Sequence, residues 1–147
     1  MDHPLWPTVV AGIVASQSGQ AEEGREQLTA AWEGCGAHDH AVRCVVAHYL
    51  ADLQEDVWAE LEWDQRALSA HEHVQDEDLA PLGIASARAF LPSLHLNLGD
   101  AWLRMGDRVR AGRHLEEARA ALDELGDDPY GDMVRKGVAR LGGRLRS

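Results

Sequence analysis

The side chains best suited to chemistry in this 147-residue chain are two thiols and two imidazoles within one ten-residue stretch, Cys35, His38, His40 and Cys44. Two thiolates and two imidazoles are the ligand set of a structural zinc site, and His40 and Cys44 would share one face of a helix because they are four residues apart. Their spacing matches no common zinc signature, and small buried cysteines beside a glycine-capped loop account for the same pattern. We therefore predict no metal and no cofactor, and a metal-binding helical protein that uses these four residues stays open as the alternative.

Catalytic signatures are missing from the sequence. It contains no Gly-x-Ser-x-Gly nucleophile elbow, no Gly-x-x-x-x-Gly-Lys-Ser/Thr phosphate loop and no His-Glu-x-x-His zinc motif. We predict that the chain is not an enzyme. A small-molecule pocket lined by Trp63, Trp102 and His95 is a further hypothesis, although aromatic side chains at helical spacing more often belong to a core.

The charge of the chain is acidic and unevenly distributed. There are 25 acidic and 14 basic residues, which gives a formal net charge of −11. Residues 1–80 hold 16 acidic and 3 basic residues (−13), whereas residues 81–147 hold 9 acidic and 11 basic residues (+2). This balance argues against nucleic acid as the main partner, because Lys and Arg supply most of the affinity for phosphates. It favours a basic partner for the first half of the chain.

The sequence shows no sign of export or membrane insertion. No basic residue precedes the short apolar run of residues 9–15, as a secretory signal would require, and no segment approaches the roughly 20 apolar residues of a membrane span. Two cysteines without an export signal are most simply thiols in a reducing compartment. We expect a cytoplasmic protein with no membrane partner.

The elements that must position these residues are helices. Ala, Leu, Glu, Arg and Gln are abundant and strand patterns are nearly absent, which predicts an all-α fold. Gly, Pro and Asp signals divide the chain into helical segments at about 5–18, 21–33, 40–53, 57–73, 79–105, 108–125 and 130–145. Pro92 either kinks the long segment 79–105 or starts a new helix within it. The short turns between segments predict antiparallel hairpins.

Small residues recur at the same offsets in two of these hairpins, where two helices must approach closely. Gly12, Gly19, Gly24, Leu28 and Ala31 correspond to Gly99, Gly106, Ala111, Leu115 and Ala118. A looser middle unit runs through Ala47, Ala59, Trp63 and Ala67. After the third unit, an apolar stripe predicts a helix that caps the open end of the stack. Its members are Val134, Val138, Leu141 and Leu145.

This spacing resembles the tetratricopeptide repeat, a pair of helices of about 34 residues with the signature Trp-x-x-Leu-Gly-x-x-Tyr, then Ala-x-x-x-Phe, then Ala. The clearest match is His95-x-x-Leu98-Gly99-x-x-Trp102, followed by Ala111. The resemblance implies a single domain, 1–147, of three hairpins (about 5–34, 40–73 and 84–125) and a capping helix (about 130–145). These would stack as a short right-handed α-solenoid.

One departure from the repeat has a structural consequence. The interval from Gly12 to Ala47 is 35 residues, but that from Ala47 to Gly99 is 52, about 18 more than one period. We expect the surplus, around residues 71–88, to lengthen the flanking helices or to insert an extra turn.

The resemblance also implies a function, because the first helix of each hairpin in this family lines a concave surface that receives a peptide or a helix. The corresponding residues here are Trp6, Val9, Ile13, Gln17, Cys44, His48, Asp52, Ser93, Leu96, Asp100, Leu103 and Arg104. This surface is apolar, with Asp52 and Asp100 as its negative points. It lacks the Lys, Asn and Arg set with which some members clamp acidic C-termini, since only Asn97 is retained. We expect a non-catalytic adaptor or scaffold whose partner is a protein or peptide of basic and apolar character, or a second copy of the chain.

Overall fold

The computed structural model describes residues 2–147, and this part of the chain contains helices, turns and no β-strand. The all-α prediction is confirmed. The α-helices are α1 (Trp6–Gln17), α2 (Ala21–Gly34), α3 (His40–Ala51), α4 (Val57–His71), α5 (Leu91–Arg104), α6 (Arg108–Ala120) and α7 (Pro129–Arg146). Three 3-10 helices are interspersed, η1 (Asp76–Leu82), η2 (Arg88–Phe90) and η3 (Leu122–Glu124). None of these helices combines the length and the apolar character that a membrane span requires.

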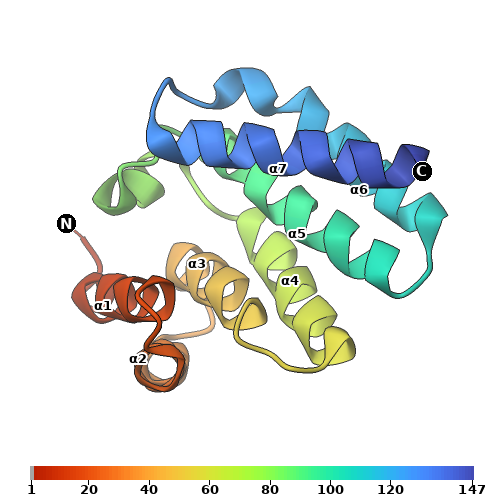
Figure 1. Cartoon of the computed structure of the whole chain (residues 1–147). Helices are drawn as coiled ribbons and strands as arrows, with labels where there is room; N and C mark the ends of the chain where they lie inside the picture. The colour runs from red at the N-terminus through yellow and green to blue at the C-terminus, as the bar shows by residue number, and fades with distance from the viewer. Residues whose placement is uncertain (1) are drawn as a thin grey trace.

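Consecutive helices pair, as the short turns predict. Helices α1 and α2, α3 and α4, and α5 and α6 form three hairpins in chain order (Figure 1). Each hairpin contacts the next, because α2 packs against α3 and α4 packs against α5. The last helix, α7, lies across the third hairpin and contacts both α5 and α6 (Figure 1).

Local sequence signals set the turns of these hairpins. Gly19 follows α1 and Gly106 follows α5, in the turns of the first and third hairpins. Their φ values are +82° and +87°, a left-handed conformation that glycine adopts without steric cost. Asp107 then caps α6, since its Oδ1 accepts a hydrogen bond of 2.9 Å from the backbone N–H of Arg110. Gly19 and Gly106 therefore have the same left-handed conformation, whereas only the second is followed by a side-chain cap, at α6, because Gln20 before α2 makes no such hydrogen bond.

Two expected segments are divided differently in the structure. Pro92 starts a new helix and does not kink a long one, because it lies in the first turn of α5. Backbone N–H groups in the first turn have no partner within the helix, so the absence of this group in proline costs no hydrogen bond. The surplus of residues after α4 forms η1 and η2, so the insertion of extra turns is confirmed and a continuous segment 79–105 is wrong. Helix α6 ends at Ala120, before the expected residue 125, and gives way to η3.

The hydrophobic core surrounds α3, whose side chains are buried on almost every face. The main core joins residues of seven helices, α1 to α5 together with η1 and η2, and includes Val9, Leu28, Val45 and Phe90. A second core lies under α7, where the expected stripe is buried at Val134, Val138 and Leu141 while Leu145 packs at its edge. Helix α7 therefore packs its apolar stripe against α5 and α6.

The inserted helix η1 packs back onto the first two hairpins. Leu79, at its centre, is fully buried in the same core cluster as Val9 and Cys44. Leu82 and Ile84 line a common hollow with Ile13 of α1 and Tyr49 of α3. As a result, η1 covers part of the face that a regular stack of hairpins would leave open.

Candidate functional site

Four carboxylates gather where α3, α4 and α5 meet. Asp52 follows the last residue of α3, Glu60 and Asp64 lie one turn apart on α4, and Asp100 lies on α5. The negative charges of their neighbours act on both Asp52 and Asp64, so these four side chains interact electrostatically. We call these four residues the carboxylate cluster.

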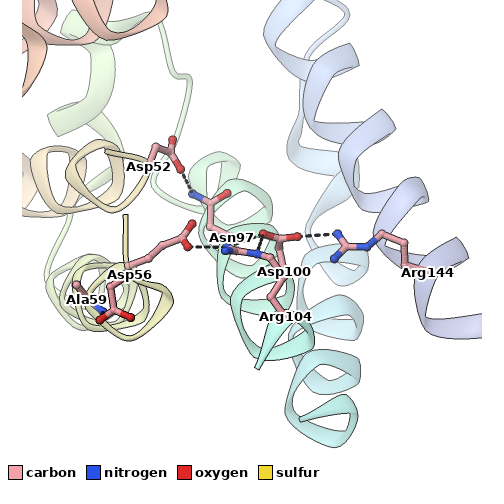
Figure 2. A network of polar contacts seen from close by, with 8 residues as sticks. Asp52, Asp56, Ala59, Asn97, Asp100, Arg104 and Arg144 are labelled. Atoms are coloured by element: carbon pink, nitrogen blue, oxygen red, sulfur yellow. Dashed lines mark hydrogen bonds and ion pairs between the residues drawn. The ribbon is translucent and has the colours of Figure 1, made fainter. Parts of the chain in front are cut away.

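Two arginines neutralise one side of the carboxylate cluster. The guanidinium of Arg104 donates to Glu60 Oε2 at 2.6 Å and to Asp100 Oδ2 at 2.9 Å. Arg144, from α7, donates to the other oxygen of Asp100 at 2.6 Å (Figure 2). These ion pairs link α4, α5 and α7. Within the described residues the cluster therefore has two paired carboxylates, Glu60 and Asp100, and two that no arginine contacts.

Asp52 is held by a neutral amide. Its Oδ1 accepts a hydrogen bond of 3.3 Å from Asn97 Nδ2 (Figure 2). The same nitrogen lies 3.4 Å from His48 Nδ1. Asp52 reaches the surface, but α4 and α5 crowd its carboxyl, and the loss of water together with the charges of Glu60 and Asp100 raises its pKa to about 6. Burial lowers the pKa of His48 to about 4, so this imidazole is neutral at pH 7 and supplies no compensating charge.

Asp64 is the least compensated group of the cluster. Its exposed fraction is 2%, and neither carboxylate oxygen has a hydrogen-bond partner in the part of the chain that the structure describes. Burial, and then the charges of Asp52 and Glu60, raise its pKa to about 8, while Asn97 and Arg104 oppose this shift without cancelling it. A buried carboxyl without a partner is costly to folding, which is why such groups mark candidate functional sites.

A hollow with apolar walls adjoins the carboxylate cluster. Its volume is about 300 Å³, and helices α1, α3, η1 and the start of α7 supply its walls. The lining residues are Val10, Ile13, Val14, Tyr49, Pro81, Leu82, Gly83, Ile84, Asp128 and Tyr130. Burial raises the pKa of the Tyr49 phenol, and the charge of Asp52, three residues further along the chain, adds to this shift. Tyr49 therefore links the apolar hollow to the carboxylate cluster along α3.

The structure separates the residues expected to line a groove. Trp6, Val9, Cys44 and His48 are at most 6% exposed and belong to the interior, so they offer no open surface to a partner. Leu96 and Leu103 pack against the core beneath α7, Ser93 is buried with its hydroxyl bonded to Tyr130 at 2.5 Å, and Gln17 is exposed. Ile13 lines the apolar hollow. The remaining three, Asp52, Asp100 and Arg104, come together at the carboxylate cluster.

Two elements that the repeat pattern does not predict cover parts of the expected groove and so divide it. Helix η1 covers α3 and the start of α1, and α7 covers the middle of α5. Glu60 and Asp64, which sequence reasoning did not select, complete the site from α4. A signal for Asp64 exists in the sequence, since it lies three residues from both Leu61 and Ala67, which are buried on the same stripe of α4.

The four proposed zinc ligands do not converge. The Cys44 thiol is buried, which raises its pKa to about 12, and the Cys35 thiol donates to the Trp32 carbonyl at 3.3 Å. The His40 ring packs against His73, with 4.5 Å between ring centroids. Among residues 2–147 no three His, Cys, Asp or Glu side chains are placed to hold a metal ion together.

The three residues of the hypothetical small-molecule pocket have different neighbours. Trp63 packs edge-on against Trp32, with ring centroids 4.9 Å apart. His95 is buried, and its Nδ1 lies 2.9 Å from Nδ1 of His114 on α6. Trp102 lies under the guanidinium of Arg110, 4.8 Å from the ring centroid, and shares a surface hollow with Gln65 of α4 and His114 of α6. These contacts are those of packing residues.

Comparison of the chain with protein-family models, curated proteins and solved structures found no match.

Proposed function

We propose that this chain is a non-catalytic protein-interaction module that binds a peptide or helix of apolar and basic character. The observation that supports this proposal most directly is that the apolar hollow and the carboxylate cluster adjoin through Tyr49 and Asp52. An apolar wall beside uncompensated negative charge is complementary to a segment that has an apolar side chain next to a cation. Val10 and Val14 leave 38% and 57% of their surfaces exposed at this hollow, where a partner would cover them.

We propose a short tetratricopeptide-like stack, with units at about 5–34, 40–73 and 84–125 and α7 as the cap, as the framework for this face. Two positions of the repeat face each other in both the first and the third hairpins. A Cβ added to Gly24 would lie 2.9 Å from the carbonyl oxygen of Gly12, and one added to Gly99 would lie 3.4 Å from that of Ala111. Gly12 and Gly99 are equivalent in the repeat, as are Gly24 and Ala111. This shared close approach supports a repeated hairpin geometry.

Such a module needs neither metal nor cofactor, since affinity would come from apolar contact and charge. Cys35 and Cys44 are both free thiols, which is consistent with a reducing compartment, and we place the protein in the cytoplasm on that ground.

Peptide selection with matched variants tests the proposal. Peptides selected from a random display library against the purified chain should be enriched in Lys or Arg close to an apolar residue. Their affinity, measured by calorimetry, should fall at least about tenfold, or about 1.4 kcal/mol, in Val14→Asp. Val109→Asp is the matched control, because Val109 is also an exposed valine (67%, against 57% for Val14) and lies on α6, outside the hollow. Peptides that bind Val14→Asp as tightly as the parent chain would exclude the hollow as the binding surface.

A further inference from the structure

The carboxylate cluster has more negative charge than its own arginines neutralise. Arg104 is engaged by both Glu60 and Asp100, and Arg144 occupies the second oxygen of Asp100 (Figure 2). Asp52 meets only the amide of Asn97, and Asp64 has no hydrogen-bond partner among residues 2–147. Both of these carboxylates therefore lack a cationic partner from the part of the chain described.

The arrangement of the cluster shows which chemical group would complete it. Arg104 demonstrates that a guanidinium fits between carboxylates of α4 and α5, at 2.6 Å and 2.9 Å from their oxygens. Asp64 is 2% exposed and feels the charges of Asp52 and Glu60, so a cation seated on Asp52 would also act on a second, buried carboxyl. Asp64 is a buried carboxyl without a hydrogen-bond partner among the described residues, and Asp52 is exposed. Together they are complementary to a group that has both a positive charge and N–H donors.

We propose that Asp52 and Asp64 form a counter-ion pair for one lysine or arginine side chain of a bound protein segment. This inference rests on the proposed function and specifies the chemical group that is recognised. The apolar residue next to this cation would occupy the hollow, one turn of α3 away at Tyr49.

The sign of the pH dependence follows from the groups that face the pair. The groups that act on Asp64 are Asp52 at the end of α3, Glu60 on α4, and Asn97 and Arg104 on α5. Arg104 also pairs with Asp100, which in turn accepts a hydrogen bond from Arg144. The negative neighbours and burial keep a proton on Asp64 at neutral pH. A bound cation favours the ionised carboxylate, so part of the binding free energy is spent on deprotonation at low pH. Affinity for the cation therefore rises from pH 5 to pH 9.

Methylguanidinium, a small cation with N–H donors, tests the proposal on the full chain without a peptide. We expect the ¹³C carboxyl signals of Asp52 and Asp64 to titrate at lower pH in its presence than in tetramethylammonium at the same ionic strength, since the latter cannot donate hydrogen bonds. An opposite charge within about 4–6 Å shifts a carboxyl pKa by about 1–3 units, so the dissociation constant should fall about tenfold or more between the two ends of this range.

Variants assign the effect to the pair. Asp52→Asn and Asp64→Asn should each remove most of the pH dependence. Asp52 is exposed, so its replacement should leave the packing of the core unchanged. Glu62→Gln is the matched control, because Glu62 is on the same helix as Asp64 but its side chain is 69% exposed. Identical titrations in the two salts, or a parent-like pH profile in Asp64→Asn, would overturn the proposal.

The selected peptides separate this inference from the proposed function. If a peptide binds at the hollow with an affinity that is equal at both ends of the pH range and unchanged when its Lys or Arg becomes Gln, the counter-ion pair is wrong and the interaction module stands. If methylguanidinium binds with the expected proton release and no peptide is selected, the counter-ion pair is supported and the interaction module is wrong.

Discussion

The substitution Asp64→Asn should stabilise this protein increasingly as the pH rises. Asp64 is 2% exposed, without a hydrogen-bond partner in the described residues, and has a pKa of about 8 in the fold against 3.8 in an unfolded chain. Between these values the folded protein retains a proton that the unfolded chain has released. The free energy of unfolding therefore falls as the pH rises through this window and levels off once the folded carboxyl ionises, above about pH 8.

The size of the effect follows from proton linkage. One bound proton of difference lowers the free energy of unfolding by up to about 1.4 kcal/mol for each pH unit. Between pH 6 and pH 8 the parent chain should thus lose about 2–3 kcal/mol relative to Asp64→Asn. Any pH-independent cost of the introduced amide cancels from this difference, as do contributions from groups that titrate equally in both proteins. Its neighbours Asp52 and Glu60 are retained in the variant.

Urea unfolding of both chains across this pH range measures the difference. Tryptophan fluorescence suits the assay, because Trp32 and Trp63 pack edge-to-face in the fold and separate on unfolding. Glu62→Gln should follow the parent chain, since that carboxylate is solvated. If the free energies of unfolding of parent and Asp64→Asn run parallel from pH 6 to pH 8, Asp64 is not an uncompensated acid and the reasoning about the cluster fails.

Three further predictions concern packing and reactivity. Leu28→Ala should cost about 2–5 kcal/mol in urea unfolding, because Leu28 is fully buried in the main core; a loss under about 1 kcal/mol would contradict that burial. Gly99→Ala should cost about 1–3 kcal/mol, since its Cβ would lie 2.7 Å from Leu141 Cδ2, and Leu141→Ala should reduce this cost in a double-mutant cycle; additive effects would show that the two positions are not in contact. Iodoacetamide should modify Cys35 and spare Cys44 in the folded chain, because burial raises the Cys44 pKa to about 12, and mass spectrometry should find a second adduct only after unfolding.

The helices were predictable because their limits depend on nearby residues. Segment 21–33 becomes α2 (Ala21–Gly34), and segment 130–145 becomes α7 (Pro129–Arg146), since Gly and Pro act within one turn of the backbone. The segment 57–73 ends earlier, at His71, where the following acidic residues build η1 instead. The sequence predicts that Leu79 begins the helical segment 79–105, but Leu79 lies in η1 and is fully buried in the core with Val9 and Cys44. That placement depends on contacts with segments distant in the sequence, which local periodicity does not record.

The candidate site was only partly predictable because burial depends on contacts between distant segments. Asp52, Asp100 and Arg104 were selected from the repeat and do meet in the structure. Cys44 and His48 were selected by the same rule and are buried, because the extra residues after α4 return to cover α3. Nothing local to α3 records that return, which joins residues more than twenty positions apart.

The need for a ligand at Asp64 can be argued from what the fold would gain without it. Leu61 and Ala67 are buried on either side of Asp64, so an apolar residue there would complete the stripe. The link between α4 and α5 already exists through Glu60, Arg104 and Asp100. Asp64 therefore adds a carboxyl whose ionised form becomes favourable only when a cation binds. If this is correct, one substitution should have two opposite effects: Asp64→Asn should raise stability at alkaline pH and, in the same range, weaken the binding of methylguanidinium. A gain in stability with cation affinity unchanged at every pH would show that the carboxyl is a defect of packing and not part of a binding site.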